Sequence, residues 1–569
     1  MRSARCVLWA TVVATLACGA PAASANPPDV DATRLEQLVT VDGVLEHQEA
    51  VQEIADANDG TRHTRTQGYL DSAAYVKDTL EAAGYDARYE MFNMPIWHET
   101  QAPVMALVSP TAKTYVPGTR DDDGKPTVDF ITFEHSPTAA VTAPVVPVSN
   151  IVIPSPGGTD SGCEEEDYPA AIDGAIALIQ RGDCSFVAKL QLAEAAGAVG
   201  VILFNEGDTA TRTAALFRSA DPGYEIPAVL SSFAVGKELY DLYKAGQAPR
   251  VNLQTFGVEV PTFYPNVVAD TPRGDRDHMV FAGAHLDSVP AGPGINDDGS
   301  GTAFQLELAE QLAKAGTPPR NMIRFLWFGG EEDGLVGSQY YAAHMSEDEV
   351  ARTDVMIDTD MIASPNFARL VYDGNHDETA EGTPGPPGSG VIEMVFERYW
   401  AQRGMASENI PFDGRSDYVG FVNRGIASGG VFAGAEAPKT AAQVALYGGV
   451  EGEQLDPCYH EPCDTYDTVT GQPPADTMNV FEADPTPANL AIAQAQANSL
   501  NGNAIRSLEQ FLPNLTHAVW YFARVKGAIP DTATATTAKA RTTKAARARK
   551  SAKRGYRFKY MGDRLARVR

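Results

Sequence analysis

The chain has 569 residues, of which 44% are hydrophobic and 21% are charged, and its formal net charge at neutral pH is −29. This composition is ordinary for a folded protein and excludes a chain that is disordered throughout. The length allows two or three domains, and the acidic body carries no basic patch or motif of a nucleic-acid-binding protein.

The N-terminal residues 1–25 have the features of a secretory signal sequence. Two arginines precede the apolar run CVLWATVVATLACGA, and Ala-Ser-Ala follows at 23–25, so we expect cleavage after Ala25. The alternative, a lipoprotein attached through Cys18, is disfavoured because Leu16 lies one position away from its place in a lipobox. No other apolar run reaches about 18 residues, so we expect a secreted, extracellular protein without a transmembrane segment.

The first part of the mature chain predicts helices followed by strands. Residues 30–92 contain three stretches with helical apolar spacing, and Gly84 ends the third of them before a strand. Residues 100–150 are rich in Pro, Thr and Val and predict strands and loops. Residues 174–204 predict a strand, a helix and a second buried strand, which together form a compact unit.

From residue 278 onward, predicted strands and helices alternate. The strands are HMVFAGAHLD, MIRFLWFGGEE and VMIDTDMI, and the helices are GTAFQLELAEQLAKAG, GLVGSQYYAAHM and GVIEMVFERYWAQRG. This alternation predicts an α/β fold with a mostly parallel mixed sheet and helices on both faces. In such sheets, functional groups gather at the carboxyl ends of the strands.

Metal-type ligands lie at three of these strand ends. His285 and Asp287 end the first strand, Glu331 and Glu332 end the second, and Asp360 ends the third. A solvated loop acid explains any one of them, but not all of them together. Because alternate strand residues face the same side, we expect Asp287 to accept the second N–H of the His285 ring. Adjacent strand residues face opposite sides, so we expect Glu331 and Glu332 to have different roles, one as a metal ligand and the other as a base.

Four of the six cysteines lie outside the signal sequence. An even number in an exported protein indicates two disulfides, with four reduced core cysteines as the alternative. Of the three possible connectivities, proximity favours Cys163–Cys184 and Cys458–Cys463.

Five motifs in the second half of the chain carry a resemblance to a known family. They are, in order, HLDSV…GINDDGSG, GGEEDGLVGSQYY, DTDMIASPN, DGRSDY and DPCYHEPCD. Together they resemble metallopeptidase family 28, the secreted bacterial di-zinc aminopeptidases of the leucyl-aminopeptidase type, which have the zinc exopeptidase fold. The segment IQRGDCSFVAKLQLAEAAGAVGVILFN resembles the α+β protease-associated domain that commonly interrupts this family.

The resemblance implies two Zn²⁺ ions per chain. It assigns His285 and Asp360 to one ion, Glu332 and His460 to the other, and Asp297 to both. Some relatives are activated by calcium, but no calcium ligands can be matched in this sequence.

The resemblance also implies the catalytic and substrate-binding residues. Glu331 would be the general base acting on a metal-bridged water, and Tyr459 would hydrogen-bond the reacting carbonyl. Arg415 matches a substrate-contacting arginine. The Cys458–Cys463 pair matches a short disulfide that flanks the ligand histidine. Phe432, in GGVFAGAEA, is our candidate for a wall of the substrate pocket.

The sequence therefore predicts a monomeric aminopeptidase that releases single, large apolar residues from peptides with free N-termini. Two alternatives are a single-zinc glutaminyl cyclase of the same fold and a non-catalytic, receptor-like ectodomain. The expected division of the chain is a signal sequence (1–25), the N-terminal part of the catalytic domain (26–139), the protease-associated insert (140–256), the remaining catalytic domain (257–530) and a basic disordered tail (531–569). Residues 539–569 carry thirteen Lys and Arg against one Asp, as expected for a processed or solvated tail or for a segment that binds an anionic surface.

Overall fold

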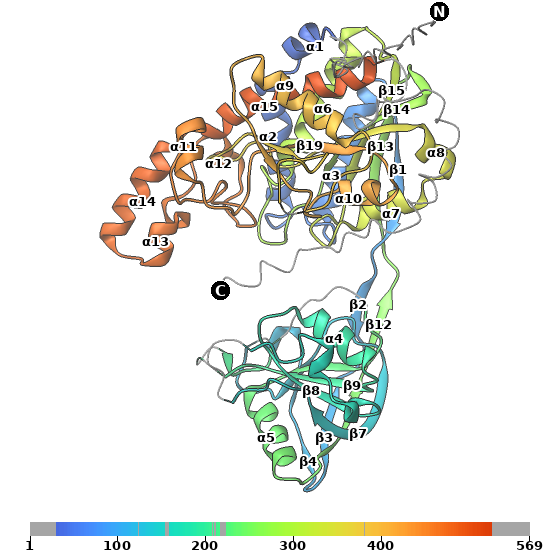
Figure 1. The fold of residues 1–569 in the computed structure, drawn as a ribbon, viewed down its shortest axis with the longest axis vertical. Helices are drawn as coiled ribbons and strands as arrows, with labels where there is room; N and C mark the ends of the chain where they lie inside the picture. Colours follow the sequence, from blue (N-terminus) through green and yellow to red (C-terminus); the bar gives the residue numbers. More distant parts are fainter. Residues whose placement is uncertain are drawn as a thin grey trace, which may run out of the picture.

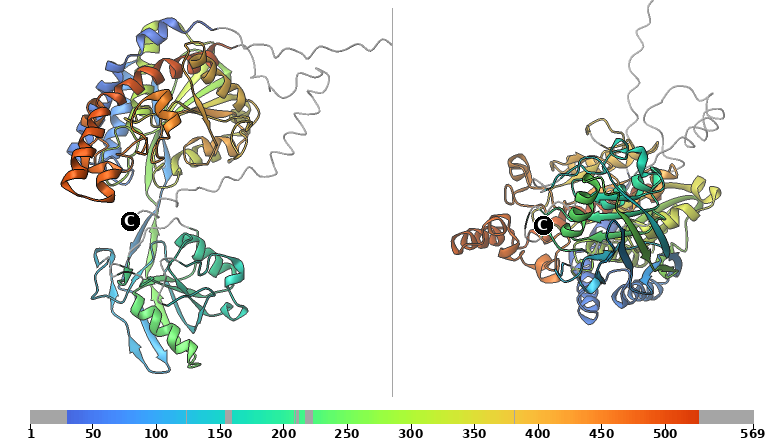
Figure 2. Two further views of the ribbon diagram at one scale, coloured as in Figure 1. Left: turned by 60° about the vertical axis from the view of Figure 1, so that its left-hand side comes forward. Right: turned by 90° about the horizontal axis from the view of Figure 1, so that it is seen from below.

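The computed structural model describes residues 30–525, apart from 123, 154–158, 208, 210–211, 217–222 and 381. The expected signal sequence and basic tail lie outside the described residues. Two lobes are joined by a narrow two-stranded ribbon, and both views in Figure 1 and Figure 2 (left) separate them clearly. Among the described residues, no helix is both long and apolar enough to cross a membrane.

The larger lobe is built on an eight-stranded sheet with the order β1-β13-β15-β14-β16-β19-β17-β18. Its strands are β1 (Asp86–Asn93), β13 (Phe263–Asp270), β14 (Asp275–His285), β15 (Asn321–Phe328), β16 (Thr353–Thr359), β17 (Leu370–Tyr372), β18 (Glu408–Ile410) and β19 (Ser428–Phe432). The central strands β15, β14, β16 and β19 run parallel to one another, whereas the β1–β13, β13–β15 and β17–β19 pairs are antiparallel. The predicted mostly parallel mixed sheet is therefore confirmed.

Helices cover both faces of this sheet, also as predicted. One face packs against α1 (Thr33–Leu38), α2 (Val41–Ala57), α3 (Gln67–Ala82), α6 (Gly299–Ala315), α9 (Ser389–Ala401) and α15 (Asn503–Arg524) in one continuous core. The other face packs against α7 (Val336–His344), α8 (Glu347–Arg352) and α10 (Tyr418–Asn423). Alternate residues of β14 enter the two cores, Val280 and Ala282 on one side and Met279 and Phe281 on the other.

Shorter helices follow the last strand. They are α11 (Ala441–Tyr447), α12 (Tyr466–Thr470), α13 (Asn479–Ala483) and α14 (Pro487–Ser499). In Figure 1, α13 and α14 project from the left-hand side of the larger lobe. Short 3-10 helices cover Arg120–Asp122, Glu165–Asp167, Ala170–Ile172 and Ala475–Thr477.

The smaller lobe contains a nine-stranded sheet with the order β4-β3-β11-β7-β8-β9-β10-β6-β5. Its elements are β3 (Val104–Ser109), β4 (Lys113–Thr114), β5 (Pro117–Gly118), β6 (Phe130–Thr132), β7 (Ala139–Pro147), β8 (Ile176–Gln180), α4 (Phe186–Ala195), β9 (Gly200–Phe204), β10 (Ala228–Ser231), α5 (Phe233–Lys244) and β11 (Arg250–Thr255). The unit β8–α4–β9, with its strands parallel, is the strand–helix–strand predicted for residues 174–204.

The smaller lobe begins earlier in the chain than the expected boundary at residue 140. Strand β3 pairs with β11 near the end of the insert, so residues from Val104 onward belong to the smaller lobe's sheet and not to the catalytic lobe. The connection to the larger lobe is the antiparallel ribbon of β2 (Ile96–Glu99) and β12 (Gly257–Val260). The Trp97 indole donates to the Ser136 carbonyl at 2.9 Å and fastens this ribbon to the smaller lobe.

Candidate metal centre

The predicted ligands meet at one rim of the larger sheet. His285 is the last residue of β14, and Asp360 directly follows β16. Asp297 comes from the loop before α6, and His460 comes from the loop between Cys458 and Cys463. Since β14, β15 and β16 are parallel neighbours, their carboxyl ends bring these loops together.

Five side chains form two groups that share one member. His285, Asp297 and Asp360 form the first group and Asp297, Glu332 and His460 the second, with the ligand atoms of each group within 4.8 Å of one another. One oxygen of Asp297 lies 3.1 Å from His285 Nε2, and its other oxygen lies 3.2 Å from His460 Nε2. Asp297 therefore faces both groups, as a bridging carboxylate does.

The donor set fits two divalent cations. Glu332 Oε1 and Asp360 Oδ1 are buried and have no hydrogen-bond partner among the described residues. A buried carboxylate oxygen without a partner is costly, and a metal ion would satisfy both. Imidazole nitrogen and carboxylate oxygen are ligands that zinc accepts in open, catalytic sites.

The electrostatics of the rim also favour bound cations. Burial raises the pKa of Glu331 well above its ordinary value, with the neighbouring Glu332 contributing. Burial likewise raises the pKa of Asp298 and of Glu332. Burial opposes ionisation of Asp297 too, but hydrogen bonds from His285 and His460 hold its pKa below the ordinary value. Carboxylates outnumber cations here, so positive charge is needed if all of them are to ionise.

Asp287 supports the centre differently from the sequence prediction. His285 Nδ1 lies 3.1 Å from the backbone carbonyl oxygen of Asp287, and 3.6 Å from its carboxylate. The carboxylate instead accepts the backbone N–H groups of Glu331 and Glu332, at 3.3 and 3.4 Å. Asp287 thus orients the imidazole through its backbone and fixes the turn of the two glutamates through its side chain.

The expected strand geometry of Glu331 and Glu332 is wrong, because β15 ends at Phe328. Gly330 has a φ of +68°, which favours glycine, and it turns the chain out of the strand. Glu331 then opens a turn in which the Gly334 N–H donates to its carbonyl. Glu332 Oε2 lies 3.1 Å from His460 Nε2, whereas Glu331 belongs to neither ligand group.

His460 is held in an unfavourable backbone conformation. Its φ is +60°, a value that residues with a side chain rarely adopt and that clusters at functional sites. The Cys458–Cys463 disulfide closes the loop around it, and the Tyr459 ring stacks on its imidazole with a centroid distance of 3.8 Å. The second disulfide joins Cys163 to Cys184 in the smaller lobe, so both favoured pairings are present.

A cavity of about 430 Å³ opens over the ligands. Glu331, Tyr459, Arg415 and Phe432 line it. The remaining apolar lining residues include Leu370, Tyr372, Ile410 and Leu455. Leu370, Ile410, Leu455 and Phe432 belong to one apolar cluster, so this part of the lining can take an apolar group.

Arg415 positions the hydroxyl of Tyr459. Its guanidinium donates two hydrogen bonds to Glu436, at 2.8 and 3.2 Å, and one to Tyr459 Oη at 3.1 Å. Because a guanidinium can only donate, the tyrosine oxygen is an acceptor in this contact. The hydroxyl proton of Tyr459 therefore remains available for a hydrogen bond to another acceptor.

Three further residues shape the centre and were not identified from the sequence. The Asp464 carboxylate accepts the backbone N–H groups of Asn296 and Asp297, at 2.7 and 2.9 Å. The Ser416 hydroxyl donates to Asp360 Oδ2 at 2.8 Å. Asp464 lies within the motif DPCYHEPCD and Ser416 within DGRSDY. Arg62 is fully buried and donates to carbonyl oxygens of the loop after β14, including that of Pro293 at 2.8 Å, and no sequence signal marks it.

Two family models match the chain. The model of peptidase family M28 matches residues 266–481, and the PA domain model matches residues 141–239. An aminopeptidase of Pseudomonas aeruginosa is 41% identical over 76% of this chain and 77% of its own length. A probable lipoprotein aminopeptidase of Mycobacterium tuberculosis is 36% identical over 82% and 87%, respectively. A probable leucine aminopeptidase 2 of Aspergillus fumigatus is 35% identical over 76% and 80%.

A solved structure supports the same fold. The aminopeptidase from Aneurinibacillus sp. strain AM-1 matches with a TM-score of 0.54 at 21% identity, covering 88% of this chain and 98% of that one. This structural likeness shows the fold alone, whereas the identity and coverage of the sequence relatives show the family. The chain therefore belongs to peptidase family M28, with an inserted PA domain, and is an enzyme that hydrolyses peptides.

Proposed function

We propose that this protein is a secreted zinc aminopeptidase that releases single, large apolar residues from the free N-terminus of peptides. The observation that carries the proposal is the pair of ligand groups that share Asp297, four of whose five members line one cavity. The names of the relatives, aminopeptidase and leucine aminopeptidase, support it.

In this proposal, His285 and Asp360 would hold one Zn²⁺, Glu332 and His460 would hold the other, and Asp297 would be shared by both. When bound, a zinc pair supplies Lewis-acid activation of a water molecule and polarisation of the scissile carbonyl. Two complete groups of ligands favour two ions over the single zinc of a cyclase. Zinc analysis should therefore find two ions in this centre.

The chain's own residues then move the protons. Glu331 is in the cavity but in neither ligand group, so it can take the proton of the attacking water and return it to the leaving amine. Tyr459, whose oxygen accepts from Arg415, keeps its proton and donates a hydrogen bond to the developing oxyanion. Glu331 and Asp360 also provide negative charge for the substrate's α-ammonium group.

The shape of the cavity accounts for the choice of substrate. Phe432 and Leu370 lie on its apolar side, where the first side chain of the peptide is proposed to bind. The distance between the ammonium site and the metal ligands then allows one residue between the free N-terminus and the bond that is cleaved. An acetylated N-terminus loses a charged hydrogen bond, a loss of about 1.5–3 kcal/mol.

The test compares leucyl-nitroanilide with its N-acetyl form. We expect the acetylated substrate to be cleaved about 100-fold more slowly, the scale of a charged hydrogen bond. Phenanthroline should abolish cleavage of the free substrate, and added zinc should restore it. Comparable rates on the two substrates would contradict the aminopeptidase proposal without affecting the metal ligands. No cleavage of either substrate by zinc-loaded protein would contradict the proposed preference for large apolar residues.

The proposal includes export and domain organisation. The apolar N-terminal segment and the two disulfides support a signal sequence cleaved after Ala25. We propose residues 257–530 as the main part of the catalytic domain. The inserted domain is proposed to extend over residues 100–256, since the β2–β12 ribbon flanks this range.

A further inference from the structure

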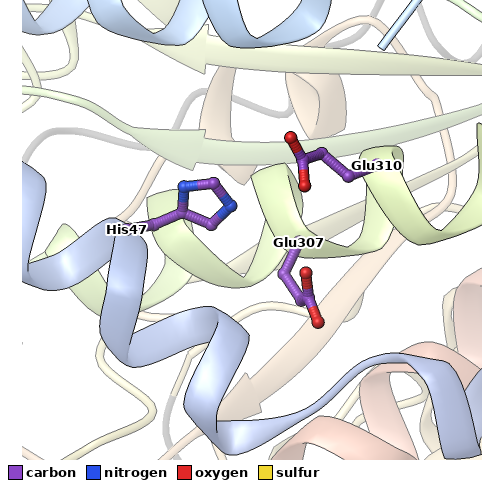
Figure 3. Close-up of side chains that lie close together, drawn as sticks. All are labelled: His47, Glu307 and Glu310. Carbon is purple, nitrogen blue, oxygen red and sulfur yellow. The ribbon is translucent and has the colours of Figure 1, made fainter.

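A second cluster of metal-type ligands lies between α2 and α6, and it shares no residue with the proposed catalytic centre. His47 of α2 and Glu307 and Glu310 of α6 each offer a ligand atom, and these atoms lie within 4.8 Å of one another. Figure 3 shows a ring nitrogen of His47 directed toward the side where the two glutamates lie. The proposed reaction uses none of these three residues.

The His47 ring is fixed in a way typical of a metal ligand. Its Nδ1 lies 2.7 Å from the Tyr75 hydroxyl, and the residue is only 6% exposed. Within the described part of the chain, no hydrogen bond or ion pair reaches its other ring nitrogen, Nε2. A metal-bound imidazole has this pattern, with one nitrogen held by a neighbouring group and the other directed at the ion.

The Glu307 carboxylate is equally well fixed. It is 3% exposed and accepts the Thr40 N–H at 3.1 Å, the Thr40 hydroxyl at 3.3 Å and the Gln311 amide at 3.0 Å. Gly43 makes room for it, because a Cβ at that position would lie 2.3 Å from Glu307 Oε1. A carboxylate has about four lone-pair sites, so these three contacts leave about one for an ion.

Glu310 completes the cluster from the surface. Lys314 pairs with its Oε2 at 3.1 Å, and its side chain is 26% exposed. This partial exposure gives an ion a path to the buried His47 and Glu307. Burial lowers the pKa of His47 against the opposing effect of Glu310 and Glu307, which favours the neutral ring that binds metal ions.

We propose that His47, Glu307 and Glu310 bind one divalent ion of the zinc class and so link α2 to α6. Zinc holds such ligands at about 2.0–2.2 Å, so small side-chain rotations bring the three atoms onto one ion. One imidazole and two carboxylates leave the fourth tetrahedral position to water. The ion's two positive charges balance the two glutamates.

Zinc content per chain tests this site. After equilibration with zinc and removal of the excess, wild-type protein should hold one ion more than Glu310→Gln or His47→Gln. Glu49→Gln is the matched control, since Glu49 lies on α2 but is exposed and outside the cluster. Glu310→His keeps a zinc ligand and should retain the ion. The difference between variants does not depend on how many ions the catalytic centre holds, so the two proposals fail separately.

Turnover of leucyl-nitroanilide should be unchanged in these variants and reports whether each is folded. Equal zinc content in wild type and folded Glu310→Gln would overturn the proposal. A second measurement needs no variant. Wild-type crystals grown with zinc should show an anomalous peak at the zinc edge between His47, Glu307 and Glu310, and a map without it would also overturn the site.

Discussion

Replacing Glu331 by Gln should separate the base from the metal ligands. Glu331 is 8% exposed, lines the cavity, and its backbone is held by Asp287 at 3.3 Å. Glutamine has the same shape but cannot accept the proton. A positioned general base contributes about 10²–10⁴ in rate, so kcat should fall by that factor, which corresponds to about 2.7–5.4 kcal/mol at 1.36 kcal/mol per tenfold. The zinc content should not change.

Glu332→Gln is the matched control, because it makes the same chemical change one residue away. Glu332 Oε2 lies 3.1 Å from His460 Nε2, and its Oε1 has no hydrogen-bond partner among the described residues. Loss of its charge should remove one zinc. Both variants are assayed by metal analysis and by steady-state cleavage of leucyl-nitroanilide. Loss of zinc from Glu331→Gln, or turnover within about tenfold of wild type, would refute the assignment of the base.

Three other predictions concern the disulfides, the tail and pH. Peptide mapping without reduction should find Cys163 joined to Cys184 and Cys458 to Cys463, and a free Cys458 in active protein would contradict the pairing. Deletion after residue 530, beyond the end of α15 at Arg524, should leave turnover on small substrates unchanged, and a large loss would show that the tail contributes to the catalytic lobe. Burial, together with Glu397 and Asp373, raises the pKa of Glu393 to about 8. Its stabilising contribution is therefore present below the unfolded value of about 4.3 and lost as pH rises through about 8. Glu393→Gln lacks this dependence, so its free energy of unfolding relative to that of the wild type should rise between about pH 5 and 8. If the free energy of unfolding changes equally with pH in both proteins, the raised pKa of Glu393 is refuted.

Local sequence patterns were sufficient to predict the central sheet and most of the rim. The apolar runs that end at His285 and just before Asp360 mark strand ends directly, and parallel pairing then places both residues at one edge. The geometry of Glu331 and Glu332 could not be obtained this way. It depends on the positive φ of Gly330 and on contacts with Asp287, and alternation along a strand describes neither.

Contacts between distant parts of the chain were the second kind of feature that local sequence patterns could not predict. Strand β3 pairs with β11, whose sequence lies more than a hundred residues away, and so precedes the boundary at residue 140 that followed from the resemblance to a protease-associated domain. Asp464 could not be predicted for the same reason, because it supports the centre by accepting the backbone N–H groups of Asn296 and Asp297. A carboxylate that binds amides from another loop has no local pattern of its own.

The β2–β12 ribbon makes the smaller lobe separable from the catalytic lobe. Glu99 and Gly257 are paired across the ribbon, so the chain leaves and re-enters the larger lobe at neighbouring points. The arrangement is a hairpin in which a whole domain takes the place of the turn. The ends of an inserted domain that lie so close together add little loop-closure entropy to folding. The smaller lobe can therefore be removed without changing the register of the strands at the rim, and a two-residue Asn-Gly turn joining Glu99 to Gly257 would make this deletion.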